Sequence, residues 1–405
     1  METNQLRLNF SKKDNLLIVI VMSLAGLGLI MIYSASAMTA LQKYGDSFYF
    51  LKRQVVWIII SVTVMLLVSK IDLDILKRIH LPLIVLSGVL LILVLIPGIG
   101  TEINNSRRWF RLGPLSFQPS ELAKVSLIIY LSAYLIKKGD KIKDFFNGFI
   151  PPLLIIGFMS LLIVVEPDLG TVLVISIGSG ILLFIGGARI LHISGLFLSV
   201  LPVVIILIIN VGYRARRITA FLHPWDDPRG VSYQIVQSFL AFGNGGALGR
   251  GVGGGRQKLF FLPEAHTDFI FSVVGEELGF AGCLAVTLLF MFFLWRCLII
   301  IRNHWGSFEG YLASGITIFI GLQIIINLYV VTGLFPTKGL ALPFLSFGGT
   351  SLLTNMVLVG MLYAISGRSP VMHHVEARKN SKFRVPDSKQ YQSFPSLDGR
   401  GQRGG

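Results

Sequence analysis

The sequence predicts an all-α polytopic membrane protein with about ten transmembrane helices and a large extracytoplasmic loop between helices 7 and 8. Its 405 residues are 53% apolar and only 14% charged, with a mean hydropathy of +0.72, whereas soluble domains carry about 25% charged residues. Several apolar runs also approach the roughly 20 residues that span a bilayer as a helix. These observations exclude collagen-like, disordered, coiled-coil and small disulfide-stapled proteins.

Ten apolar segments carry this prediction. The fourth contains Glu121 and Lys124, and the second is short unless it begins near Leu51. The first could instead be a signal peptide cleaved after 35–37, although its 19-residue run exceeds the usual apolar region of such peptides. The segments are 15–33, 54–69, 81–97, 119–136, 149–165, 169–187, 190–212, 269–295, 310–334 and 348–366.

The distribution of Lys and Arg predicts the orientation of the chain. An even number of spans places both termini on one side, and with cytoplasmic termini 21 cations lie inside and 14 outside. We therefore expect a cytoplasmic N-terminal tail (1–14), a membrane domain (15–366) and a disordered cytoplasmic tail (367–405).

The 14 outer cations lie mostly in two loops. Long loops can escape the positive-inside rule, but the cations could also meet an anionic ligand, since Arg pairs bidentately with phosphate oxygens. Phosphate-bearing lipid is the obvious candidate. The cations in question are Arg107, Arg108 and Arg111 in one loop, and Arg214, Arg216, Arg217, Arg229, Arg250, Arg256 and Lys258 in the other.

The long outer loop, 213–268, is too rich in aromatic residues for a disordered connection, and such long connections are usually functional or disordered. Eight glycines fall within 243–255. The G-x-G-x-x-G string there lacks the strand that a dinucleotide site requires, so the glycines permit close backbone approach to a ligand or form a hinge.

Asp268 ends this loop and is the candidate catalytic base. We expect Thr267 to be the N-cap of the eighth span, with Asp268 in its first turn. The helix dipole alone would favour an acid there. However, a carboxylate at the edge of a span beside a basic loop could also accept a proton in catalysis.

Other polar residues interrupt the apolar spans. Glu276 and Glu277 lie deeper in the eighth span, and Glu121 and Lys124 form an i, i+3 pair that is either structural or functional. Glu166 and Asp168 form either a plain outer turn or a polar site that could hold a divalent cation, Mg²⁺ or Mn²⁺.

The last outer loop, the cysteines and the histidines indicate less about function. Pro336 to Gly349 contains one Lys and is rich in Pro and Gly, which suggests a shaped loop, possible at membrane depth only where protein or water satisfies it. Cys283 and Cys297 lie 14 residues apart on one helix, too far for a disulfide. The histidines show no metal-ligand spacing.

Together these motifs resemble the SEDS family of membrane proteins (shape, elongation, division and sporulation). Within it, the segments 262–271 and 336–339 are more similar to division-type than to elongation-type members, and sporulation-type members are close as well. Phe347 departs from the tyrosine common before the paired glycines. The matching stretches are 107–113 through 118–124, 166–171, 233–234, 258–278 and 336–349.

The resemblance implies a peptidoglycan glycosyltransferase that polymerises lipid II outside the cytoplasmic membrane, with Asp268 as general base. It also implies a class B penicillin-binding protein as partner, other membrane proteins of the division machinery, and a septal location. No nucleic acid is expected. The substrate-binding residues expected are Arg108, Lys124, Arg217, Gln234, Glu264, Lys338 and Ser346.

Two other functions remain open. A lipid II flippase would also use buried charges in its spans, although no inverted repeat is visible. A scaffold whose polar loops only hold partner proteins is the third possibility.

Overall fold

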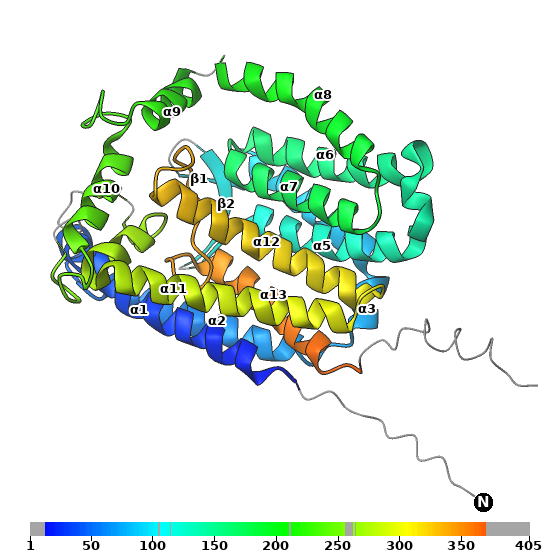
Figure 1. The fold of residues 1–405 in the computed structure, drawn as a ribbon, viewed down its shortest axis with the longest axis horizontal. Coiled ribbons are helices and arrows are strands. Elements are labelled where there is room, and N and C mark those ends of the chain that lie inside the picture. Colours follow the sequence, from blue (N-terminus) through cyan, green and yellow to red (C-terminus); the bar gives the residue numbers. More distant parts are fainter. Residues whose placement is uncertain are drawn as a thin grey trace, which may run out of the picture. The chain divides into compact units, whose positions relative to one another are not determined.

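All ten predicted segments coincide with helices in a computed structural model of the chain (Figure 1). The structure describes residues 13–103, 106–113, 115–209, 212–255, 262–263 and 265–369. Most of the two expected tails (1–12 and 370–405) lies outside them, as do Arg256, Lys258 and Glu264. The ten helices are α1 (Asn15–Tyr44), α2 (Tyr49–Val68), α4 (His80–Leu95), α5 (Pro119–Lys138), α6 (Ile150–Val165), α7 (Leu169–Ile185), α8 (Ile190–Ile209), α11 (Ile270–Asn303), α12 (Phe308–Val331) and α13 (Gly349–Ser366).

Length and composition make most of these helices suitable for crossing a membrane. Within the described residues, seven of them, some with an adjoining turn, are long and apolar enough. The helices α4 and α7 are apolar but shorter, with 16 and 17 residues. A polytopic helical membrane fold is therefore confirmed, and the count of ten crossings stays a prediction.

The helices α5 and α12 form the interior of the bundle (Figure 1). Pro119 occupies the first turn of α5, where its missing N–H costs no hydrogen bond, and Gly139 ends the helix with a positive φ of 51°. Almost every side chain of α5 from Pro119 to Leu135 is buried. The polar Glu121 and Lys124 on this helix are therefore enclosed by protein and do not face lipid.

A small antiparallel sheet between α4 and α5 was not predicted. Its strands are β1 (Thr101–Ile103), β2 (Ser106–Leu112) and β3 (Leu115–Phe117), in the order β1-β2-β3. Trp109 pairs with Thr101, and Phe110 pairs with Phe117. The strands are too short for a clear alternating pattern, and aromatic residues that favour strands are also frequent at membrane interfaces.

The long outer loop folds into helices in its described part. They are α9 (Gly212–Leu222) and α10 (Tyr233–Gly245), and α10 packs against α11 (Figure 1). Ser238 on α10 donates to the carbonyl of Val331, and its hydroxyl oxygen lies 2.6 Å from that of Ser272 on α11. The expectation that this loop packs is confirmed for α10.

The first helix continues well past the position considered for signal-peptide cleavage. Residues 35–37 lie within α1, where Ala35 and Ser36 are buried. Ser34 donates to both carboxylate oxygens of Glu277 on α11. Because α1 continues through residues 35–37 and packs within the bundle, the structure favours a retained transmembrane helix over a cleaved signal peptide.

Ion pairs join the N-terminal and C-terminal parts of the bundle at one of its ends, which the cation distribution predicts to be cytoplasmic. We call this end inner, the opposite end outer, and this set of ion pairs the inner clasp. Asp14 caps α1 and pairs with Arg296 at 2.8 Å, while its backbone N–H donates to the Ser366 hydroxyl. Arg368 pairs with Glu309 and with Asp72, the N-cap of the short helix α3 (Leu73–Arg78). The start of α1 and the end of α13 thus lie together, as an even number of spans requires.

Candidate active site

Arg108 ties the small sheet to the turn between α6 and α7. It lies on β2, and its Nε and one terminal nitrogen each donate to a backbone carbonyl, those of Glu166 and Pro167, at 2.7 Å. The guanidinium fork matches two neighbouring acceptors, which a lysine could not do. No carboxylate forms an ion pair with Arg108 among the described residues. Its charge therefore remains available at this turn.

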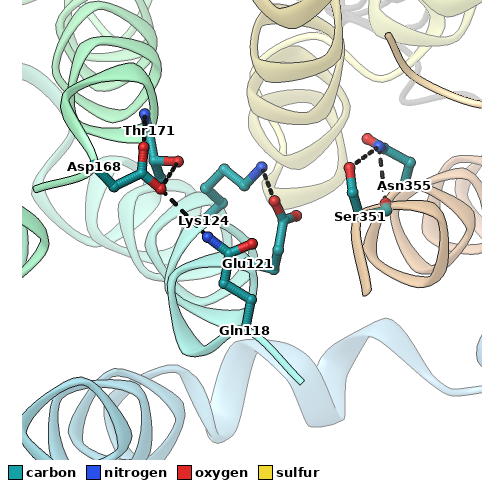
Figure 2. Close-up of polar contacts among 7 residues, drawn as sticks. All are labelled: Gln118, Glu121, Lys124, Asp168, Thr171, Ser351 and Asn355. Atoms are coloured by element: carbon teal, nitrogen blue, oxygen red, sulfur yellow. Dashed lines mark hydrogen bonds and ion pairs between the residues drawn. The ribbon is translucent and has the colours of Figure 1, made fainter. Parts of the chain in front are cut away.

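Asp168 caps the N-terminus of α7. Its carboxylate accepts from the backbone N–H and the hydroxyl of Thr171 at 3.2 and 2.9 Å, and from Gln118 Nε2 at 3.3 Å (Figure 2). These hydrogen bonds show that the Asp168 side chain serves as the N-cap of α7. Gln118 is the residue before α5, so its hydrogen bond to Asp168 holds the outer ends of α5 and α7 together.

Glu166 is the most unusual acid of the site. It is fully buried, and neither carboxylate oxygen has a hydrogen-bond partner. Burial, reinforced by the charge of Asp168 and opposed by Arg108, raises the pKa of Glu166 to about 8. The side chain is therefore mostly protonated at pH 7.

These two acids do not fit a cation site. The oxygens of Asp168 already accept hydrogen bonds, and no third His, Cys, Asp or Glu joins Glu166 and Asp168 within the described part of the chain. Divalent cations bind several oxygen ligands. A bound Mg²⁺ or Mn²⁺ stays a prediction from the sequence, and no step below depends on it.

Residues 336–340 bring further cations to the same region. The Arg217 guanidinium, from α9, donates to the Thr337 carbonyl at 3.0 Å. Burial and the neighbouring Arg217 lower the pKa of Lys338, and Asp168 partly opposes this. The ammonium also lies 5.6 Å from the centre of the Phe335 ring. Arg217 and Asp168 thus each lie close enough to Lys338 to influence its charge.

Asp268 lies against this same loop. A Cβ added to Gly339 would stand only 2.9 Å from Asp268 Oδ2, so the glycine permits the carboxylate to approach. Asn327 on α12 donates to the carbonyls of Asp268 and Leu340, at 2.9 and 2.7 Å. The buried amide therefore fixes the two segments together.

The predicted cap of α11 is wrong. The helix begins at Ile270 and its N-cap is Phe269, whose side chain makes no capping hydrogen bond, so Thr267 and Asp268 lie in the preceding turn. Phe269 and Ile270 are buried, and the His266 ring packs 4.4 Å from Phe50. Aromatic and apolar packing, which a capping pattern does not encode, sets this helix start.

Lys124 and Glu121 form the predicted pair on α5, with 2.8 Å between Nζ and Oε1 (Figure 2). Both side chains are almost fully buried, and Glu121 Oε2 has no hydrogen-bond partner. The structural interpretation explains the pair without a ligand. The buried Oε2 of Glu121 is the atom of this pair that the structural interpretation does not explain.

The other predicted site residues are more scattered. Gln234 is half-buried in the first turn of α10. Ser346 is buried, and its hydroxyl oxygen accepts from the Leu342 N–H. Arg107 pairs with Glu102, and Arg250 donates to Asn244, so these two outer cations serve other contacts.

Sequence reasoning missed Asn327 and the Gln118–Asp168–Thr171 network. Asn327 stands in the span predicted for 310–334, and a polar residue inside a span is a signal of function or pairing. It was overlooked because it carries no charge. The Asp168–Thr171 cap is local to α7, but its link to Gln118 could not be found from sequence because Gln118 precedes a different helix, α5.

This architecture defines the class of the protein. It is a polytopic helical membrane protein whose polar site is built from three outer connections. The chain belongs to the family of cell cycle proteins that comprises FtsW, RodA and SpoVE, whose model matches residues 14–370.

Several relatives support this assignment. A protein of Geobacter sulfurreducens named probable peptidoglycan glycosyltransferase FtsW is 44% identical over 88% of this chain and 95% of its own length. Stage V sporulation protein E of Bacillus subtilis is 43% identical over 87% and 96%. The division and sporulation branches are therefore about equally similar.

Solved structures confirm the fold. A chain of a peptidoglycan synthase complex that coordinates polymerization and crosslinking superposes with a TM-score of 0.73 and 30% identity, covering 88% of this chain and 98% of that one. RodA of Thermus thermophilus gives a TM-score of 0.65 and 27% identity, covering 88% and 98%.

Proposed function

We propose that this protein is a peptidoglycan glycosyltransferase that polymerises lipid II at the outer face of the bacterial cytoplasmic membrane during septal cell-wall synthesis. The observation that carries the proposal is the contact of Asp268 with a loop that bears Lys338 and receives Arg217. An acid and several cations at the outer ends of membrane helices suit a substrate that has a sugar, a pyrophosphate and a lipid. The names of the FtsW relatives support the same activity.

In the proposed reaction, Asp268 accepts a proton from the sugar hydroxyl of the acceptor. The oxygen attacks the anomeric carbon of the donor, and the bond to undecaprenyl pyrophosphate breaks with inversion. The negative charge that develops on the leaving group requires preorganised cations. Arg108, Arg217 and Lys338 are the candidates, because they lie around the turn at 166–168 and the loop beside Asp268.

A class B penicillin-binding protein is the partner that we propose, because the matched synthase complex couples polymerization to crosslinking. The division branch is favoured by the FtsW-named relatives, with the sporulation branch as alternative. Placing both termini in the cytoplasm follows from the cation distribution.

The transport alternative rests on charges buried in the spans, namely Lys124, Glu276 and Glu277. Lys124 is paired with Glu121, and Glu277 accepts hydrogen bonds from Ser34 and Gly253. These contacts support packing roles for Lys124 and Glu277.

The deciding experiment measures glycan strands made from lipid II by the purified protein with its penicillin-binding partner. We expect Asp268→Asn to abolish polymerisation while folding and partner binding persist. Asp226→Asn, an exposed acid in the same outer loop, is the matched control and should retain activity. Polymerisation by the Asp268→Asn variant would remove Asp268 as the base. Passage of lipid II across sealed vesicles containing only this protein would favour the flippase.

A further inference from the structure

The long helix α11 is broken near its outer end. Gly279 has φ 67° and ψ −164°, which is not helical, so residues 270–278 form a short outer part and residues 280–303 a longer inner part. A break leaves carbonyls before it and N–H groups after it without partners in the helix. Buried groups of this kind must find other partners.

The glycine-rich segment 245–255 supplies those partners. It gives two hydrogen bonds to the outer part of α11 and receives two from the inner part. The N–H groups of Arg250 and Gly251 donate to the carbonyls of Glu276 and Glu277 at 3.1 and 2.9 Å, and those of Phe280 and Ala281 donate to the carbonyls of Gly246 and Ala247 at 2.9 and 3.0 Å.

Only glycine permits this approach of two backbones. A Cβ on Gly249, whose φ is 80°, would lie 2.2 Å from the Glu277 carbonyl oxygen. A Cβ on Gly279 would lie 2.3 Å from the Gly249 nitrogen. The sequence left open whether these glycines permit the approach of a ligand or form a hinge. In the structure they permit the contact with α11.

A buried carboxylate fastens the segment in place. Glu277 accepts from the Ser34 hydroxyl at 2.7 and 2.8 Å and from the Gly253 N–H at 3.1 Å. It is fully buried, so the bonds act in surroundings of low dielectric constant, where hydrogen bonds are strong. One side chain thus joins α1, the glycine-rich segment and the outer part of α11.

We propose that Glu277 is a positioning residue that, through the glycine-rich segment, fixes the angle at which the outer part of α11 carries Asp268. This inference rests on the proposed role of Asp268 as the base. Nothing within α11 fixes that angle, because the helix is interrupted at Gly279. At 1.5 Å per residue, Asp268 stands about 15 Å beyond the break.

Because Asp268 lies far from the break, a small tilt of the outer part of α11 moves its carboxylate by a chemically important distance. A rotation of about 10° at the break would move the Asp268 end by roughly 2.6 Å, and a misplacement of about 1 Å can cost about 10²-fold in rate. A displacement of this size would separate the carboxylate from Gly339 and strain the bond from Asn327 to the Asp268 carbonyl.

The test compares Glu277→Ala with two glycine variants. Gly249→Ala disturbs the same contact without altering Glu277, whereas Gly243→Ala on α10 is the matched control, because a Cβ there meets nothing within 4 Å. With lipid II as substrate we expect kcat to fall about 10²-fold in the first two variants with KM little changed. The control should match the wild type.

Hydrogen–deuterium exchange of the amides at 250, 251, 280 and 281 provides a readout independent of activity. These amides should be protected in the wild type and lose protection in Glu277→Ala and Gly249→Ala. Lost protection with unchanged kcat would overturn the positioning role, and retained protection in both variants would show that the contact does not depend on Glu277, which would overturn the proposal. Failure of the proposed base would appear separately, as activity in Asp268→Asn with wild-type exchange.

Discussion

Removing one partner of the buried Lys124–Glu121 pair should destabilise the protein more than replacing both. The two charges are 2.8 Å apart, and their side chains are 4% and 8% exposed. At an effective dielectric constant near 20, their attraction is about 6 kcal/mol. Most of this offsets the cost of taking two charges out of water, but a single substitution leaves the other charge buried without compensation.

We therefore expect Lys124→Met to lower the free energy of unfolding by about 3–5 kcal/mol, and the double variant Glu121→Gln/Lys124→Met to recover most of that loss. Equilibrium unfolding in mixed detergent micelles, arranged as a double-mutant cycle, measures both values. A loss below about 1 kcal/mol for Lys124→Met, or additive losses in the double variant, would refute the reasoning.

The double variant also tests the predicted contact of Lys124 with substrate. If it folds and polymerises lipid II at the wild-type rate, the pair is structural. If it folds but polymerises slowly, Lys124 contributes to substrate use beyond its pairing with Glu121.

Two further predictions concern the outer site. The pKa of Glu166 is raised from 4.5 to about 8, so the folded state holds a proton that the unfolded state releases, and stability should fall as pH rises from about 4.5 to 8. Thermal unfolding across this range should show that Glu166→Gln is as stable as wild type at pH 4 and more stable at pH 8; equal pH profiles would contradict the buried, protonated state. Arg108→Ala and Lys338→Ala should weaken substrate use, measured as kcat/KM for lipid II, without displacing the penicillin-binding partner, and unchanged kinetics would return both cations to structural roles.

Hydrophobic segments allowed the helices to be predicted, because apolar length is encoded locally. The same logic missed β1 to β3, whose strands are short and whose pairing depends on neighbouring strands. It also misplaced the start of α11, where the packing of Phe269 and Ile270 outweighs the capping pattern.

The candidate site was predictable where residue chemistry is unusual. Asp268, Arg108 and Lys338 stand out as charges at the edges of spans, and the structure places them around connected outer loops. The sequence could not show that Asn327 joins Asp268 to Leu340, because this contact depends on the packing of α12. Nor could it choose between ligand and hinge for the glycines, since their partner lies on a distant helix.

The position of the inner clasp indicates where a reporter protein can be fused to this chain. Asp14 and Arg368 are bonded to the bundle immediately beside the residues that lead into the two tails. Asp14 pairs with Arg296, which lies 28 residues along the chain from Asp268, or roughly 40 Å at helical rise. A reporter protein fused beyond residue 369 would therefore act on ion pairs that lie far from the outer site, which makes this end a suitable place for a fluorescent reporter.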